Sequence, residues 1–297
     1  MATVLTDAEL PGMIDAAGTV AACREAILAA HRGELTAPPR VHTELGDGNL
    51  IYTTGRLGDK WFGYRSYDTI KGGEQLVVVH DGSDGSVAGI AIGQDLGRMR
   101  TGAIGGVAAD ALAAESASTM ALIGTGPQAW MQLWAINAVR PLSRVRVYSR
   151  NSERRHSFAA NASERYGIDV QAVNSAEAAA EGAEIVVLAT SSGEPVLDTA
   201  AIQPDAFVST LGPKVYGRAE FDVSLAERAR LVTTDSVAQL HAYDPPFVLA
   251  GTPHEGQVVS LGSVLDGDAP RTAGALFCSV GLAGTEAYLL ARLVGLV

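Results

Sequence analysis

A short glycine-rich turn at residues 124–126 is the first feature that points to chemistry. It follows an apolar run and precedes a stretch of helical composition, in the segment ALIGTGPQAW. In such a strand–turn–helix unit the first glycine permits a tight turn, the second lets a ligand approach the backbone, and Ala129 lets the helix pack closely on the strand. The start of the helix then points its N–H groups at an anion. The residues predicted to hold a dinucleotide pyrophosphate are Gly124, Thr125, Gly126, Pro127 and Gln128; a turn without a ligand is the alternative.

Basic residues follow the second expected strand, in the segment SRNSERR at 149–155. An acid at this place would bind the ribose 2′-hydroxyl of NAD, whereas an arginine suits the 2′-phosphate of NADP. We therefore predict NADP(H) in preference to NAD(H), bound by Arg150, Asn151 and Arg155. A solvated basic start of a helix is the alternative.

Two later segments are expected at the nicotinamide end of the same cofactor. Thr190 ends the apolar run AEIVVLAT, Ser191 follows it, and Leu211 lies near the end of the run DAFVSTLG. Parallel strands place their carboxyl ends along one edge of a sheet, where ligands bind. We therefore assign Thr190, Ser191 and Leu211 to the cofactor site; for the first two, a hydroxyl-rich turn without a ligand is the alternative.

These residues need a scaffold, and the hydrophobic pattern indicates one. Five short apolar runs alternate with helical stretches rich in Ala, Glu and Arg, which predicts an α/β fold with a Rossmann-type parallel sheet. Residues 36–93 instead alternate or run apolar between Gly and Asp turns, which predicts an antiparallel sheet with hairpins. Helices are expected over 6–31, 99–117 and the C-terminal stretch 272–296. The five runs are 119–124, 145–150, 183–190, 205–212 and 229–235.

Composition limits the classes of partner. The 297-residue chain has a net charge of −11, so it lacks the basic footprint of a nucleic-acid-binding protein. No apolar run reaches the roughly 18 residues that span a bilayer, and acids stand where a signal peptide would carry bases. The two cysteines form no CxxC pair, and the six histidines show no metal spacing. We therefore expect a cytoplasmic protein without a metal or membrane partner, acting on a small molecule.

Longer stretches resemble the ornithine cyclodeaminase/μ-crystallin family. Segment 100–151 opens with an Arg-Thr pair that leads into the glycine turn, as in that family, and LGPKVYGRAEFD at 211–222 is similar to its glycine-rich loop. RTAGALFCSVGLAGTEAYLLA at 271–291 is similar to its Phe-x-Ser-Val-Gly segment. The resemblance implies a homodimer of two-domain chains. The domains are an α+β substrate and dimerisation domain at 1–113 with 272–297, completed by the C-terminal helix, and a Rossmann dinucleotide-binding domain at 114–271.

The resemblance also implies hydride transfer at an imine carbon beside a carboxylate. The family's two carboxylate-binding arginines correspond to Arg40, in the segment APPR, and to Arg100. Both residues suit a bidentate clamp. The family's catalytic lysine corresponds to Arg65, and an arginine stays protonated and cannot act as a general base. Where cyclodeaminases carry an aspartate two residues after the first glycine of the loop, this chain has Lys214.

Four bases are thus expected to form one anion-binding pocket in an acidic chain: Arg40, Arg65, Arg100 and Lys214. We assign catalytic roles to Lys214, as a general acid whose pKa burial among bases lowers, and to Arg65. Tyr64 is assigned to the substrate, and Tyr64 and Tyr216 are alternative proton donors. The competing interpretations are an exposed loop lysine at position 214 and, at position 65, a strand-surface arginine with a carboxylate partner.

Together these features predict an NADPH-dependent imine (ketimine) reductase or amino-acid dehydrogenase acting on a small anionic imino or keto acid. The positions expected to handle protons in a deamination carry no carboxylate, which argues against a true ornithine cyclodeaminase. Two alternatives stay open: a non-catalytic NADPH- or ligand-binding protein of the μ-crystallin type, and a cyclodeaminase with rearranged acid–base groups. Segment 241–257, rich in Pro, Gly and aromatic residues, is either a lid over the cofactor or a plain surface loop.

Overall fold

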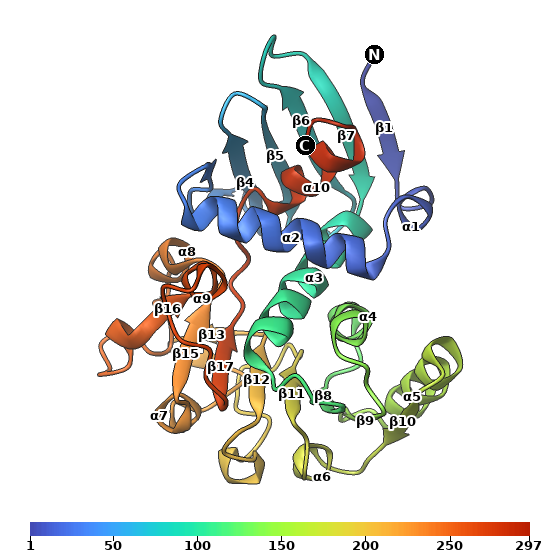
Figure 1. Ribbon diagram of the computed structural model, residues 1–297, viewed down its shortest axis with the longest axis vertical. Helices are drawn as coiled ribbons and strands as arrows, with labels where there is room; N and C mark the ends of the chain where they lie inside the picture. Colours follow the sequence, from blue (N-terminus) through green and yellow to red (C-terminus); the bar gives the residue numbers. More distant parts are fainter. The chain divides into compact units, whose positions relative to one another are not determined.

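The computed structural model describes all residues, 1–297, and divides the chain into two compact units. Unit 1 comprises Met1–Ile104 and Gly281–Val297, and unit 2 comprises Gly105–Val280 (Figure 1). Compared with the domain boundaries expected from the sequence, residues 105–113 and 272–280 fall in unit 2 rather than with the N-terminal part. Each unit is built on a sheet of its own.

Unit 2 contains an eight-stranded parallel sheet. Its strands lie in the order β10-β9-β8-β11-β12-β17-β15-β16, and each neighbouring pair is parallel. From β8 the chain runs outward through β9 and β10 and then returns to β11, on the other side of β8. This reversal creates a switch point at the carboxyl ends of β8 and β11, where ligands of such sheets bind. The strands are β8 (Thr119–Ile123), β9 (Arg144–Tyr148), β10 (Asp169–Ala172), β11 (Ile185–Leu188), β12 (Phe207–Thr210), β15 (Leu231–Thr234), β16 (Val258–Ser260) and β17 (Ala275–Cys278).

Local sequence signals set the connections in unit 2. All four residues of β11 are buried, as is typical of a strand covered on both faces. α5 begins at the N-cap Asn151, whose side chain accepts the N–H of Arg154, and it ends at Gly167 with a φ of 66°. The helices are α4 (Pro127–Val139), α5 (Ser152–Tyr166), α6 (Ala176–Ala180), α7 (Ser224–Arg228), α8 (Val237–His241) and α9 (Leu261–Asp266), with 3-10 turns at Thr199–Ala201 and Glu255–Gln257 and a small hairpin of β13 (Lys214–Val215) and β14 (Arg218–Ala219).

The C-terminal stretch expected to be helical contains a strand. β17 lies between β12 and β15, inside the sheet of unit 2. Its four residues are all buried, and a short run of buried apolar residues does not distinguish a strand from a helix by its period. Two glycines with positive φ, Gly281 and Gly284, separate β17 from the helix α10 (Thr285–Leu293). The C-terminal stretch therefore contributes the strand β17 to unit 2 and the helix α10 to unit 1.

Unit 1 contains a seven-stranded sheet that is antiparallel apart from the pairing of β1 with β7. The strand order is β1-β7-β6-β5-β4-β2, with β3 also paired to β4. The expected antiparallel hairpins are thus present. The strands are β1 (Thr3–Thr6), β2 (Leu35–Thr36), β3 (Val41–Glu44), β4 (Asn49–Leu57), β5 (Trp61–Asp68), β6 (Gln75–Asp81) and β7 (Val87–Gly93).

The helices of unit 1 cover one face of this sheet. α10 packs on β5, β6 and β7 and on α2 (Ala16–His31), so the C-terminal helix completes the first domain as expected. α1 (Leu10–Met13) is a single turn, and α3 (Asp95–Leu112) begins in unit 1. The start of α3 is capped from a distance, because the Asp7 carboxylate accepts the N–H groups of Gln94 and Asp95, each at 2.9 Å. No helix in the structure has the length and apolar character needed to cross a membrane.

Candidate active site

The turn after β8 has the geometry of an anion site. At Gly124, with a φ of +123°, a Cβ would lie 2.2 Å from the carbonyl oxygen of Ala189, so no larger residue fits. Gly126 is the N-cap of α4, and nothing lies within 4 Å of the position where its Cβ would be. No side chain caps the first N–H groups of α4. The turn therefore borders an open space next to unsatisfied N–H groups, which fits the pyrophosphate of a dinucleotide.

The three residues expected at the adenosine end have different surroundings. Arg150 is exposed, and its side chain makes no hydrogen bond or ion pair. Asn151 caps α5, while Arg155 donates to the carbonyl oxygen of Ser149 at 3.1 Å and to Oδ1 of Asn174 at 3.0 Å. The side chains of Asn151 and Arg155 are therefore engaged in local structure, and Arg150 is the one whose charge is available to a phosphate.

Glu220 connects the loops after β11 and β12. It is fully buried, and its carboxylate accepts the backbone N–H of Thr190 at 3.0 Å, the Thr190 hydroxyl at 2.8 Å, and the N–H groups of Leu211 at 3.0 Å and Gly212 at 2.5 Å. Thr190 and Leu211 are thus brought together, whereas Ser191 is exposed. Glu220 was not among the residues expected at the site. An acid inside the glycine-rich segment 211–222 was the available signal.

Lys214 is buried, with 3% of the residue exposed, so it is not an exposed loop lysine. Its Nζ atom donates to the carbonyl oxygen of Gly212 at 2.6 Å. Its charge also acts on Cys278: burial raises the pKa of that thiol to about 11, and the nearby Lys214 opposes the rise. Tyr216, the alternative proton donor in this loop, is 56% exposed. Lys214 is therefore the buried base of this loop.

Segment 241–257 supports the strand that carries Lys214. The N–H of Val248 donates to the carbonyl oxygen of Lys214 at 2.9 Å, and Phe247 and Leu249 belong to the hydrophobic core of unit 2. The segment is thus more than a plain surface loop. Its central residues anchor β13, which is a different role from that of a mobile lid.

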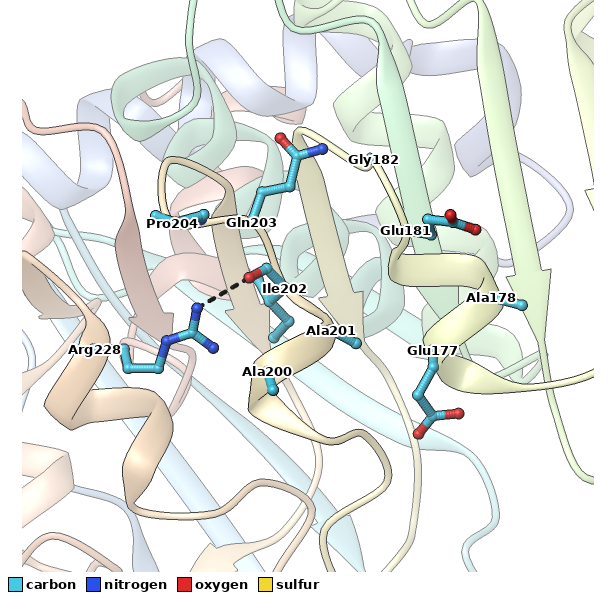
Figure 2. A pocket seen from close by; sticks show the side chains of 10 residues that line it. All are labelled: Glu177, Ala178, Glu181, Gly182, Ala200, Ala201, Ile202, Gln203, Pro204 and Arg228. Carbon is cyan, nitrogen blue, oxygen red and sulfur yellow. Dashed lines mark hydrogen bonds between the residues drawn. The ribbon is translucent and has the colours of Figure 1, made fainter.

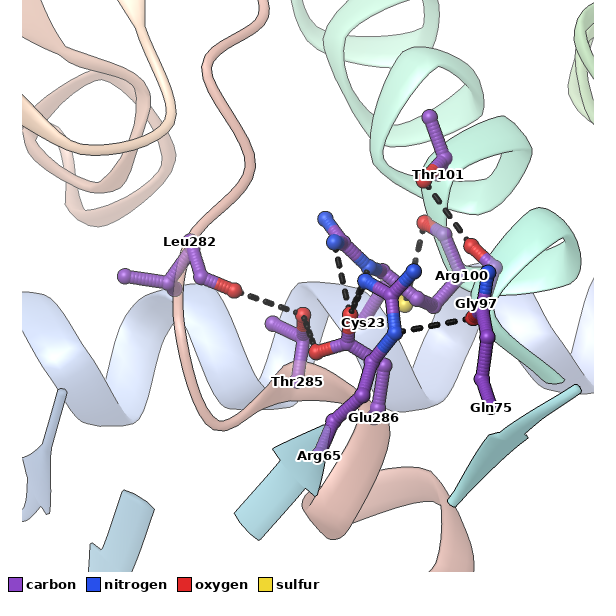
Figure 3. Close-up of polar contacts among 9 residues, drawn as sticks. All are labelled: Cys23, Arg65, Gln75, Gly97, Arg100, Thr101, Leu282, Thr285 and Glu286. Carbon is purple, nitrogen blue, oxygen red and sulfur yellow. Dashed lines mark hydrogen bonds and ion pairs between the residues drawn. The ribbon is translucent and has the colours of Figure 1, made fainter. Parts of the chain in front are cut away.

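In unit 1, Glu286 of α10 binds two arginines (Figure 3). Its Oε1 atom lies 2.6 Å from Nη1 of Arg65, 2.6 Å from Nη2 of Arg100 and 2.7 Å from Nε of Arg100. The Glu286 side chain is fully buried. Burial alone would raise the pKa of Glu286, but the guanidinium groups of Arg100 and Arg65 outweigh it and hold the pKa below its ordinary value. Glu286 was not among the residues expected at the site, although an acid within the apolar stretch around α10 was an available signal.

Arg65 is held on several sides. Besides Glu286, its Nε atom donates to Oε1 of Gln75 at 2.9 Å, and its guanidinium lies 4.1 Å from the centroid of the Tyr67 ring. Arg65 is buried, so it is not the strand-surface arginine of the competing interpretation. The carboxylate partner that this interpretation expected is present, as Glu286. These contacts favour a supporting role for Arg65 over the catalytic role that the sequence analysis assigned.

Arg40 and Arg100 approach each other at Gly281. A Cβ on Gly281, whose φ is +83°, would lie 2.9 Å from Nη1 of Arg100 and 3.3 Å from Nη2 of Arg40. Two guanidinium groups therefore meet beside a backbone position that has no side chain. Paired guanidinium groups suit a carboxylate, which accepts two hydrogen bonds from each planar fork.

Tyr64 is not part of this arginine cluster. Successive residues of a strand point to opposite faces of the sheet, so Tyr64 and Arg65 of β5 lie on opposite faces. Gly63, on the face of Arg65, is in contact distance of Ala287 of α10. The period of two in β5 therefore separates Tyr64 from Arg65, and the expected role of Tyr64 at the substrate stays a prediction.

A surface pocket of about 690 Å³ in unit 2 is a separate feature (Figure 2). Gly182, Gln203 and Pro204, which line it, precede β11 and β12, and Arg228 closes one side by donating to the carbonyl oxygen of Ile202 at 3.2 Å. The pocket thus lies at the amino ends of these strands. Because ligands of parallel sheets bind at the carboxyl ends, this pocket is not the dinucleotide site.

The model of the ornithine cyclodeaminase/mu-crystallin family matches residues 3–294. The chain belongs to this family. It is similar to the alanine dehydrogenase of Archaeoglobus fulgidus (27% identical over 239 residues, 78% of this chain and 73% of that protein) and to the iminosuccinate reductase of Paracoccus denitrificans (29% over 226 residues, 75% and 69%). The solved Delta(1)-pyrroline-2-carboxylate reductase of Thermococcus litoralis, in complex with NADH and L-proline, superimposes with a TM-score of 0.87 at 25% identity, covering 98% of this chain and 96% of that one.

Membership of the ornithine cyclodeaminase/mu-crystallin family confirms the predicted fold class. The parallel sheet of unit 2 and the separate sheet of unit 1 correspond to the Rossmann-like and substrate-binding parts of the solved relative. The correspondence of Arg65 to the family's catalytic lysine and of Lys214 to the cyclodeaminase aspartate stays a prediction of the sequence analysis. Both residues are buried.

Proposed function

We propose that this member of the ornithine cyclodeaminase/mu-crystallin family is an NADPH-dependent reductase of small 2-imino acids, which in reverse is an amino-acid dehydrogenase. The observation that carries the proposal is the open space at Gly126, beside the uncapped start of α4. The names of the relatives, an iminosuccinate reductase, a pyrroline-2-carboxylate reductase and an alanine dehydrogenase, support this reaction class. They favour it over a non-catalytic binding protein.

The cofactor residues belong to unit 2. When bound, the reduced nicotinamide supplies the hydride for the imine carbon. The backbone from Gly124 to Gln128 holds the pyrophosphate, while the Glu220-linked loops with Thr190 and Leu211 hold the nicotinamide end. We infer a preference for NADP(H) because the exposed Arg150 stands at the end of β9, where a 2′-phosphate binds. The relative from Thermococcus litoralis was solved with NADH, so the proposed preference for NADP(H) rests on residues of the present chain alone.

The substrate carboxylate is assigned to Arg40 and Arg100 in unit 1. Nη1 of Arg100 and Nη2 of Arg40 lie within 3.3 Å of the position that a Cβ on Gly281 would take, and planar guanidinium groups suit a carboxylate. Glu286 and Arg65 support this pair from behind. The assignment predicts a small substrate with a carboxylate next to the reacting carbon.

Lys214 is assigned as the proton donor. Reduction of a C=N bond adds a hydride to carbon and a proton to nitrogen, so the site needs a group with a transferable proton. The ammonium group of Lys214 carries such a proton, and the residue is buried, with 3% exposed. An arginine at position 65 cannot take this role, because its pKa is too high. A lysine in place of the cyclodeaminase aspartate also argues against deamination as the main reaction.

The assembly is proposed to be a homodimer. One face of the unit 1 sheet is covered by α10, and the opposite face carries exposed apolar side chains: Val4 at 55%, Phe62 at 40% and Ile92 at 37%. Tyr64 shares this opposite face. A second copy of the chain covering it would remove these side chains from water. Light scattering on the purified protein tests this, and a monomer at micromolar concentration would exclude it.

The two free buried cysteines, Cys23 and Cys278, agree with the expected cytoplasmic location.

The reaction is tested by following the absorbance of NADPH and of NADH. The panel contains Delta(1)-pyrroline-2-carboxylate, its six-membered homologue, pyruvate, oxaloacetate and 2-oxoglutarate, with the keto acids tried with and without ammonium. Oxidation of NADPH with an imine or with a keto acid plus ammonium supports the proposal. Tight NADPH binding without turnover of any member points to a binding protein. Release of ammonia from ornithine without net cofactor consumption points to a cyclodeaminase.

A further inference from the structure

We propose that Glu286 is a positioning residue for substrate binding, which fixes the guanidinium of Arg100 in the orientation that receives the carboxylate. Arg65 is the counter-charge that holds Glu286 in place. The inference rests on the proposed function, because it requires a carboxylate substrate at Arg100. It adds a residue that sequence reasoning did not assign.

The contacts of Arg100 divide its guanidinium into two edges. Its Nε and Nη2 atoms lie 2.7 and 2.6 Å from Oε1 of Glu286, and two contacts from one edge fix the plane of the group as well as its position. Its Nη1 and Nη2 atoms lie 2.9 and 3.4 Å from the position of a Cβ on Gly281, on the side of Arg40, so the edge formed by Nη1 and Nη2 faces this glycine. The carboxylate of Glu286 therefore sets the direction in which the other edge of Arg100 points.

Arg65 links Glu286 to the sheet. Its Nη1 atom lies 2.6 Å from Oε1 of Glu286, while its Nε atom binds Gln75 of β6. The series Gln75, Arg65, Glu286 and Arg100 thus connects β6, β5, α10 and α3 through three buried side chains and the half-buried Gln75 (Figure 3). Side chains held by packing and by further hydrogen bonds keep a binding group in a fixed geometry.

Charge and orientation predict opposite effects when Glu286 is neutralised. Arg65, Arg100 and Glu286 have a formal charge of +1, and Glu286→Gln raises it to +2. If the cluster acted through charge alone, an anionic substrate would bind more tightly to the variant. If Glu286 positions Arg100, the substrate binds more weakly in spite of the added positive charge.

The test uses Glu286→Gln with Delta(1)-pyrroline-2-carboxylate as the probe and NADPH as the cofactor. We expect KM for the probe to rise by at least about tenfold, because a charge-assisted, bidentate contact loses its orientation. The dissociation constant of NADPH, measured by fluorescence, stays unchanged, since its residues belong to unit 2, and this also reports that the variant is folded. Glu25→Gln is the matched control, because Glu25 pairs with Arg292 of the same helix, α10, at a partly exposed site. An unchanged or lower KM in Glu286→Gln overturns the inference.

A second variant keeps the test decisive if Glu286→Gln does not fold. Arg65→Lys preserves the charge but cannot bind Gln75 and Glu286 with one planar fork, and we expect KM to rise by about threefold or more with NADPH binding unchanged. An unchanged KM in this variant overturns the inference. Failure of the wild-type protein to bind or reduce any imino acid overturns the proposed function, and the inference with it. Normal wild-type turnover with insensitive variants overturns the inference alone.

Discussion

Glu220 and Thr190 are thirty positions apart in the sequence and share two hydrogen bonds, at 3.0 Å to the backbone N–H and 2.8 Å to the hydroxyl of Thr190. The other carboxylate oxygen binds the N–H groups of Leu211 and Gly212. One buried side chain therefore holds the loops after β11 and β12 at a fixed spacing. These are the loops assigned to the nicotinamide end of the cofactor.

Replacing Glu220 by Gln is expected to lower both stability and NADPH affinity. The amide presents an NH₂ group to backbone N–H donors, and leaving buried groups unsatisfied costs about 1–3 kcal/mol. Urea unfolding and a fluorescence titration with NADPH measure the two effects. Glu194→Gln, at an exposed position in the loop after β11, is the control. Equal stability of both variants would show that Glu220 has no such role.

Gly126→Ala is expected to weaken NADPH binding by about tenfold or more, with a loss of stability of no more than about 1 kcal/mol because alanine is a poorer N-cap than glycine. The new methyl group meets no protein atom within 4 Å, so it enters the space reserved for the pyrophosphate. Gly256→Ala is a suitable control, since its added Cβ also lies in open space in the same unit. Thermal unfolding and NADPH titration of the two variants check this. Equal NADPH affinity would remove the pyrophosphate from this turn.

Arg150→Ala is expected to weaken NADPH binding far more than NADH binding, because NADH lacks the 2′-phosphate. A charge-assisted hydrogen bond to phosphate corresponds to a loss of about 1.5–3 kcal/mol. The ratio of KM values for the two cofactors is the measurement. Arg154→Ala, another exposed arginine in the same segment, controls for a general loss of positive charge. An equal loss for both cofactors would contradict the preference for NADP(H).

Lys214→Gln is expected to reduce kcat for imine reduction by about 10²–10⁴-fold, the usual contribution of a general acid. NADPH affinity should change little. Lys214→Arg is the informative companion, since it restores the charge but not a readily transferred proton. Stopped-flow and steady-state kinetics of both variants distinguish proton donation by Lys214 from an effect of its charge alone. If Lys214→Arg recovers most of the activity, the side chain acts through its charge.

The buried Glu286 is expected to make the stability of the fold depend on pH. The pKa of Glu286 lies below its ordinary value of 4.5 in the folded chain, so its contribution to stability is present above pH 4.5 and is lost as the pH falls through the lowered value. Glu286→Gln should therefore be less stable than the wild type at neutral pH, by about 3 kcal/mol, with a difference that shrinks in acid. Chemical unfolding between pH 3 and 7 measures this. A difference that is independent of pH would contradict it.

The glycine turn was predictable because its signals are local. The expected strand at 119–124 and helix from about 127 agree with β8 and α4, since the apolar run and the Gly and Pro residues act over a few positions. The strand β17 was not predictable in the same way, because burial on both faces gives four apolar residues no visible period. The position of β17 between β12 and β15 in the folded sheet, rather than its local sequence, determines that it is a strand.

The missed acids have a different cause. Glu286 and Glu220 are recognised by their partners, and some of those partners lie far away in the sequence: Arg65 is 221 positions from Glu286 and Thr190 is 30 positions from Glu220. A sequence shows the charges but not which of them share a buried carboxylate. Asn151 was assigned to the cofactor from its position after β9; its side chain caps α5, and its contact with the cofactor stays a prediction. A polar residue at the start of a helix serves the backbone before it serves a ligand.

Unit 1 is formed by two segments that are far apart in the chain, and this has a consequence for its folding during translation. Its sheet and α2 are translated first, but α10 follows only after the whole of unit 2, ending with β17, has been made. During translation Arg65 and Arg100 therefore have no Glu286, and two guanidinium groups remain without the carboxylate that orders them. The arginine cluster of the nascent chain is completed only when this last helix leaves the ribosome and docks.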